Sequence, residues 1–156
     1  MDYCSWFSTE SRDNVGANAK GTLVKVESRW WESHHPNGSY NKRAPRKGGG
    51  LAIDYFFCSK SAPAVIDSDQ ETGQWTATRL APGEPADIAG ANTTAYLRYF
   101  SVCHGVTVTE ENLYEQTVVL GKKFGYHVVW DPDQMQITIR RPEDILADQG
   151  ANTQKN

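Results

Sequence analysis

Residues 109–140 read TEENLYEQTVVLGKKFGYHVVWDPDQMQITIR, and in them a helical pattern runs directly into a strand pattern. Between Leu113 and Phe124 the apolar side chains recur at three- and four-residue spacing, which is typical of an amphipathic helix. Two glutamates near its start, two lysines in its last turn and Gly125 after it are typical helix-end signals. The stretch therefore predicts a helix over 110–124.

The segment after this helix has the pattern of two short strands joined by the turn Asp131–Gln134. Residues 135–141 alternate apolar and polar side chains, and 126–130 are mostly apolar, so we expect a C-terminal β-hairpin over 126–140. Neither the helix nor the hairpin is stable alone in water, so we expect their apolar faces to pack together. The residues expected to meet are Leu113, Val118, Leu120 and Phe124 with Met135, Ile137 and Ile139.

Upstream of residue 109 the sequence indicates one more helix and three strands. Threonines that can cap a helix, then aromatic side chains at helical spacing and Gly105, predict a helix over about 94–104. Period-two alternation or β-branched and aromatic content predicts strands at 21–31, 51–58 and 74–80. The expected fold class is α+β, with a small antiparallel sheet, two helices and the closing hairpin.

Length and composition indicate one folded domain. The chain has 156 residues and a net charge of -3, and 38% hydrophobic content is too high for a disordered chain. We expect a polar arm at 1–20, a single α+β domain at 21–146 and a flexible tail at 147–156. No apolar run approaches the roughly 20 residues that a membrane helix needs. With no signal-peptide pattern at the start, we expect a soluble, cytoplasmic protein without a membrane partner.

The three cysteines, Cys4, Cys58 and Cys103, lie far apart and form no C-x-x-C pair. An odd count without a secretory signal favours a reducing compartment. We therefore expect two small buried hydrophobic side chains and one free thiol near the N-terminus, and no thiolate zinc knuckle.

The stretch 32–50 is the strongest functional candidate, because it reads as a long Gly- and Pro-containing loop, and such loops are uncommon unless functional or disordered. Cations neutralise phosphates and aromatic faces stack on unpaired bases, so cationic and aromatic residues here indicate an anionic partner. We expect a non-enzymatic binding protein whose partner is single-stranded nucleic acid or an acidic protein surface; the alternative is a solvated connection. The candidate ligand-binding residues are Trp30, Trp31, His35, Tyr40, Lys42, Arg43, Arg46 and Lys47.

Charge is unevenly distributed along the chain. Residues 1–66 hold nine basic and six acidic side chains, whereas residues 67–156 hold seven basic and thirteen acidic ones. This asymmetry indicates two different surfaces, of which the N-terminal one is the better match for an anion.

Gly50-Leu51-Ala52-Ile53-Asp54 resembles the G-x-A-x-D end of the zinc D,D-peptidase motif S-x-H-x-x-G-x-A-x-D. The resemblance implies, as an alternative, a small hydrolase or degenerate relative with Asp54 in the site. Pro45 and Lys47 stand at the Ser and His positions, and Gln134 and Gln136 stand at the spacing of the later H-x-H. With those zinc ligands missing we expect no metal, no cofactor and no catalytic residue. Independently of the resemblance, a single Asp in an apolar strand is expected to pair with a buried Arg or a backbone donor.

Overall fold

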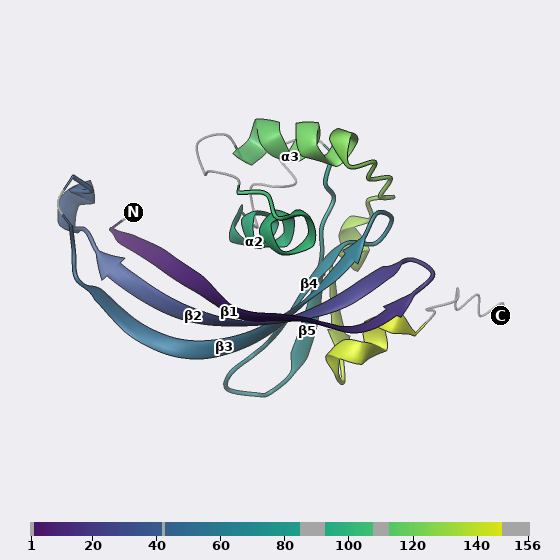
Figure 1. The fold of residues 1–156 in the computed structure, drawn as a ribbon, viewed down its shortest axis with the longest axis horizontal. Coiled ribbons are helices and arrows are strands. Elements are labelled where there is room, and N and C mark those ends of the chain that lie inside the picture. The colour runs from purple at the N-terminus through teal and green to yellow at the C-terminus, as the bar shows by residue number, and fades with distance from the viewer. Residues whose placement is uncertain (1, 42, 85–92, 108–112, 148–156) are drawn as a thin grey trace.

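The computed structural model describes residues 2–41, 43–84, 93–107 and 113–147. They form one six-stranded antiparallel sheet in which the strands follow chain order, with two helices on one face (Figure 1). This confirms the mixed α+β class. The strands are β1 (Tyr3–Asn18), β2 (Gly21–His34), β3 (Arg46–Ser59), β4 (Ala64–Ser68), β5 (Trp75–Arg79) and β6 (Gln136–Ile139). The helices are α2 (Thr93–His104) and α3 (Leu113–Lys123), with the short 3-10 helices η1 (Pro36–Gly38), η4 (Pro132–Gln134) and η5 (Pro142–Leu146).

The strands are long at one edge of the sheet and short at the other edge. Strands β1, β2 and β3 have 16, 14 and 14 residues, whereas β4, β5 and β6 have 5, 5 and 4. The first three strands therefore continue past the helices as a curved ribbon that ends at η1, on the left of Figure 1. We call residues 3–8, 29–41 and 43–50, at the free end of this ribbon, the ribbon tip.

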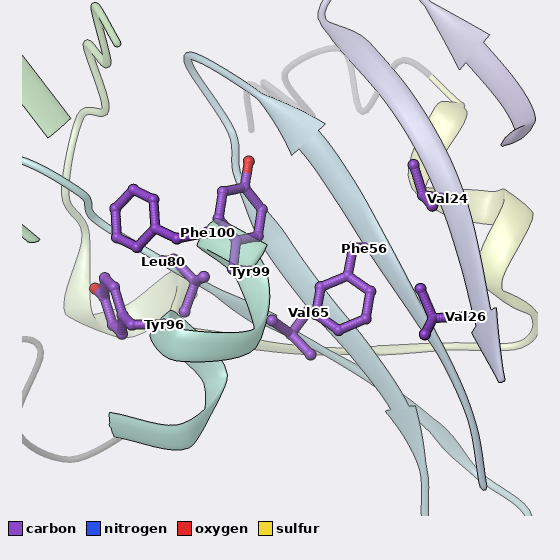
Figure 2. Packing of buried hydrophobic residues seen from close by; sticks show 8 residues of the cluster. All are labelled: Val24, Val26, Phe56, Val65, Leu80, Tyr96, Tyr99 and Phe100. Atoms are coloured by element: carbon purple, nitrogen blue, oxygen red, sulfur yellow. The ribbon is translucent and has the colours of Figure 1, made fainter. Parts of the chain in front are cut away.

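The helix-facing core follows from the period-two pattern that the sequence shows in β2. Val24 and Val26 point toward α2 and are 1% exposed, and they join aromatic side chains of the helix, as Figure 2 shows. Two tyrosine hydroxyls on α2 also accept main-chain hydrogen bonds, at 2.8 Å from Ala81 N and 3.1 Å from Ser59 N. The cluster comprises Val24, Val26, Phe56, Val65, Leu80, Tyr96, Tyr99 and Phe100.

The opposite face of the sheet has a second, smaller core. Leu23, the residue next to Val24, is fully buried there with Ile66 and Ala77. Apolar side chains of η5 cover this cluster from outside. Because neighbours along a strand point to opposite faces, the two cores share the same strands.

The polar arm expected at residues 1–20 is wrong, because β1 pairs with β2 from Tyr3 opposite His34 to Asn18 opposite Gly21. β1 is an edge strand and none of its side chains is buried. An edge strand that buries no side chain shows little hydrophobic alternation, which is the signal by which the other strands were predicted.

The long loop expected at 32–50 is strand at both of its ends, since β2 extends to His34 and β3 begins at Arg46. The connection is only residues 35–45. Gly48 and Gly49 lie within β3 with φ of 104° and 99°, next to a register shift in its pairing with β2. Glycine is the residue that adopts such angles without strain, so the triple glycine permits a bulge.

The C-terminal hairpin is absent: residues 126–130 form no strand, and β6 pairs with β5, Trp75 lying opposite Ile139. Ile139 is buried against the second core, whereas Leu120 and Phe124 of the helix region pack on the first. The expected packing between helix and hairpin is therefore wrong. The apolar face of β6 finds its partner in a strand about 60 residues away.

Both predicted helices are present. α2 matches the expected 94–104, and α3 covers the described part of 110–124, of which residues 110–112 lie outside the described chain. Gly105 and Gly125 follow them with φ of 64° and 73°, the backbone geometry expected of a glycine after a helix. Of the expected tail, only Ala147 is among the described residues.

Two of the three cysteines form a disulfide, Cys58 of β3 with Cys103 of α2, which corrects the expectation of free thiols. Their Cα atoms lie 5.5 Å apart although 45 residues separate them in sequence. Cys4 is free and half-buried. Disulfides are typical of oxidising compartments, so this bond weighs against the cytoplasmic location, which stays a prediction.

Candidate functional site

Four of the eight predicted ligand-binding residues line one pocket at the ribbon tip. The pocket has a volume of about 520 Å³ and lies where β1, β2 and the start of β3 meet the 35–45 connection. Its lining residues are Trp6, Ser33, His35, Tyr40, Arg43, Ala44, Pro45 and Arg46.

A chain of hydrogen bonds holds the inner wall of this pocket. Trp6 Nε1 donates to Ser33 Oγ at 2.8 Å, and Ser33 Oγ lies 2.8 Å from His35 Nε2. Since Ser33 Oγ accepts from the indole, its own hydroxyl proton is free to donate to His35 Nε2. This arrangement places the His35 proton on Nδ1, which lies 3.4 Å from the Ser39 carbonyl oxygen. Ser33 and His35 are 2% and 6% exposed, so the wall is rigid and buried.

The outer part of the pocket is cationic and aromatic. The Arg46 guanidinium lies 4.0 Å from the Trp6 ring centroid, a cation-π contact. Tyr40 packs beside His35 at 5.1 Å between ring centroids and is still 53% exposed. Arg43 is exposed, and none of the described residues that line the pocket carries a carboxylate. The pocket therefore offers aromatic faces and positive charge to an anion.

The other four predicted residues lie elsewhere. Trp30 and Trp31 are neighbours on β2 and belong to opposite faces of the ribbon. With Lys47 they border a separate depression of about 340 Å³, which Glu32 also lines. Lys42 lies outside the described residues.

Sequence reasoning missed Trp6 and Ser33. Trp6 is in the stretch interpreted as an arm, and Ser33 is a small polar residue without a motif. The pairing of Trp6 with Trp31 across β1 and β2, and hence its place beside the pocket, is visible only in the sheet register.

Asp54 is paired with a buried arginine, as the residue pattern by itself predicted. Arg98 Nη2 of α2 lies 2.6 Å from Asp54 Oδ2 and 3.5 Å from Ser28 Oγ. The guanidinium is surrounded by the rings of Trp30, at 4.7 Å, and Phe56, at 5.2 Å. Within the described ranges no group of three or more His, Cys, Asp or Glu side chains is placed to hold a metal ion. The arrangement at Asp54 is that of a structural ion pair.

A further polar cluster lies beside the disulfide, where the end of α2 meets the segment after α3. His104 Nε2 is 2.6 Å from Tyr126 Oη, which donates to Tyr99 Oη at 3.3 Å. Burial and the nearby Lys60 ammonium lower the pKa of His104 to about 4, and burial raises the pKa of Tyr126 to about 12. The His104 ring stacks on Phe124 at 3.9 Å. These contacts join the end of α2 to the segment after α3.

Comparison of the chain with protein-family models, with curated proteins and with solved structures finds no match. In the described part of the chain, no helix combines the length and the apolar character needed to cross a bilayer. The function is therefore inferred from the ribbon tip itself.

Proposed function

We propose that this chain is a non-enzymatic binding protein and that its ribbon tip binds single-stranded nucleic acid. The observation that carries the proposal is the pocket in which Arg43 and Arg46 stand beside Trp6 and Tyr40 with no carboxylate among the described lining residues. In a chain whose net charge is -3, such a pocket is a local positive site. Phosphates are attracted by the arginines, and unpaired bases stack on the exposed aromatic faces.

Aromatic exposure favours nucleic acid over an acidic protein as the partner. Tyr40 is 53%, Trp6 39% and Phe7 40% exposed, and Tyr3 stacks on His34 at 4.6 Å while 57% exposed. Carboxylates on a protein surface would interact with the arginines and lysines alone. Unpaired nucleic-acid bases would also stack on the exposed aromatic rings. The geometry gives the hydrolase alternative less support, because Asp54 is buried and bonded to Arg98.

The test is fluorescence anisotropy with labelled oligothymidylate and oligouridylate over a range of salt concentrations. We expect the Arg43→Ala, Arg46→Ala, Lys47→Ala triple variant to reduce the salt dependence of log K by about two, since each single-strand phosphate contact contributes roughly 0.7. The matched control removes Lys122, Lys123 and Arg140, which are equally exposed cations away from the tip. The control is expected to bind like the wild type.

The aromatic part of the proposal has its own variant. Tyr40→Ala is expected to weaken oligonucleotide binding by about 1–3 kcal/mol without changing the salt slope, because a lost stacking contact carries no charge. If the wild type binds a polyglutamate peptide and no oligonucleotide, the partner is an acidic protein and the nucleic-acid assignment is wrong. If the two triple variants bind the oligonucleotides with the same affinity and salt dependence, the ribbon tip is not the binding site.

A further inference from the structure

A second pocket lies at the opposite end of the molecule from the ribbon tip. It has a volume of about 270 Å³ and is bordered by the ends of β4 and β5 and by the extended segment that leads into η4. Its lining residues are Ser61, Ala62, Pro63, Arg79, Leu80, Val128, Val129, Trp130, Asp131 and Gln134.

Arg79 is the unusual member of this lining. Its Nε atom is buried and has no hydrogen-bond partner, the one side-chain nitrogen or oxygen of the described residues in that condition. The ion pairs among the described residues, such as Arg98 with Asp54 and Arg141 with Asp144, do not include Arg79. A buried, unsatisfied guanidinium nitrogen is costly, and native proteins satisfy nearly all such groups. Among the described residues no acceptor reaches this donor.

Main-chain N–H groups of a second segment also border the pocket. Of the segment 127–130, only His127 N donates to a main-chain carbonyl of the described residues, that of Lys60 at 3.0 Å. The N–H groups of Val128, Val129 and Trp130 make no such bond, and Val129 is 91% exposed.

We propose that the Arg79 pocket binds a small monocarboxylate. A guanidinium that takes part in none of the ion pairs of the described residues is the chemical complement of an oxyanion, because its N–H groups pair with a planar carboxylate in a two-point geometry. The pocket is smaller than the roughly 300 Å³ at which ligand sites for drug-sized molecules begin, so the ligand is small. Asp131 also lines it and repels a phosphate dianion more than a carboxylate. Pro63, Leu80 and Trp130 provide an apolar side for a short alkyl group. This site is independent of the ribbon tip.

The experiment follows the arginine Nε–Hε cross-peaks of the ¹⁵N-labelled full chain during titration with acetate, propionate and inorganic phosphate at constant ionic strength. Arg79→Lys assigns the Arg79 peak by its disappearance. We expect that peak alone to shift saturably with millimolar propionate or acetate, and at least several-fold more weakly with phosphate. The Arg141 peak is the internal control, since its Nε already bonds Asp144 Oδ1 at 3.1 Å. Equal shifts of all arginine peaks, or none at Arg79, would overturn the proposal.

Asp131→Asn tests the choice of ligand class. The Asp131 side-chain oxygen accepts a hydrogen bond from Asp133 N at 3.0 Å. An asparagine oxygen can accept the same bond, so the substitution removes only the negative charge. We expect the variant to bind phosphate more tightly relative to propionate than the wild type does. Tighter binding of phosphate than of propionate by the wild type itself, or an unchanged ratio in Asp131→Asn, would show that the site is not selective for carboxylates and contradict the assignment.

Discussion

Arg98 of α2 and Asp54 of β3 meet at 2.6 Å beneath the helix, with side chains only 8% and 11% exposed. The Arg98 guanidinium also lies over the rings of Phe7, at 5.7 Å, and Trp30, at 4.7 Å. These two rings belong to the ribbon tip, so one ion pair fixes the helix layer to the base of the tip.

Asp54→Ala is expected to destabilise the fold by about 3–5 kcal/mol, because it leaves the Arg98 charge buried without its partner. A double variant, Asp54→Leu with Arg98→Met, is expected to recover most of that loss, since apolar replacements remove both desolvation costs. Urea unfolding followed by circular dichroism measures both. A double variant no more stable than Asp54→Ala would argue against a purely structural ion pair.

The Cys58–Cys103 disulfide joins β3 to α2, and its removal by the double serine variant is expected to lower stability by about 2–4 kcal/mol. The cross-link restricts the unfolded chain over a segment of 45 residues. Thiol titration of the unreduced, denatured protein is expected to detect one thiol, that of Cys4, and three after reduction. Cys4→Ser is the matched control and is expected to unfold like the wild type. Three reactive thiols before reduction would contradict the bond.

Stability is expected to fall as the pH decreases from about 6.5 to about 4, because burial and Lys60 lower the pKa of His104 from 6.5 to about 4. In that interval the unfolded chain binds a proton that the folded chain does not, so acid favours unfolding. Above pH 6.5 the histidine is neutral in both states and contributes no pH dependence. Denaturant midpoints between pH 4 and 7.5 measure the effect, and His104→Gln is expected to flatten the curve. His127→Gln, at an exposed histidine, is the control, and an equal flattening there would contradict the assignment to His104.

Gly121→Ala is expected to destabilise the protein although alanine favours a helix by about 1 kcal/mol over glycine. A Cβ at Gly121 of α3 would overlap Gly83 N and would lie 2.6 Å from the Pro82 carbonyl carbon, both main-chain atoms. The close approach of α3 to residues 82–83 therefore requires glycine. Val119→Ala, at a 62% exposed site on the same helix, is the control and is expected to change stability by less than about 0.5 kcal/mol. A stabilised Gly121→Ala would show that the two segments do not touch.

Local chemistry was enough to predict some parts of the fold. The alternation of Leu23 with Val24 and Val26 predicted β2, and helical spacing with Gly105 and Gly125 predicted where both helices end. These features depend on side-chain periodicity and on backbone angles that only glycine adopts easily, and both are visible within one stretch of sequence.

Partners that are distant along the chain were not predictable. β1 has no buried side chain, so its sequence lacks the alternation of apolar and polar residues that indicates a strand. β6 pairs with β5 and not with residues 126–130, which precede it in the sequence. Cys58 and Cys103 form a disulfide although 45 residues separate them in the sequence. In each case the interaction depends on which segments the sheet brings together, and no local spacing records that.

For the candidate site, the sequence determined the chemistry and the tertiary structure decided the assembly. The cationic and aromatic character of 29–47 is a property of residue types, as is the pairing of a lone buried Asp54 with an arginine. Only the register of β1 on β2 brought Trp6 beside Ser33 and His35, and only the fold placed Trp30 and Trp31 beside a separate depression. The orphan nitrogen of Arg79 likewise appears only in the folded chain, because a missing hydrogen bond is a property of the surroundings and not of the residue.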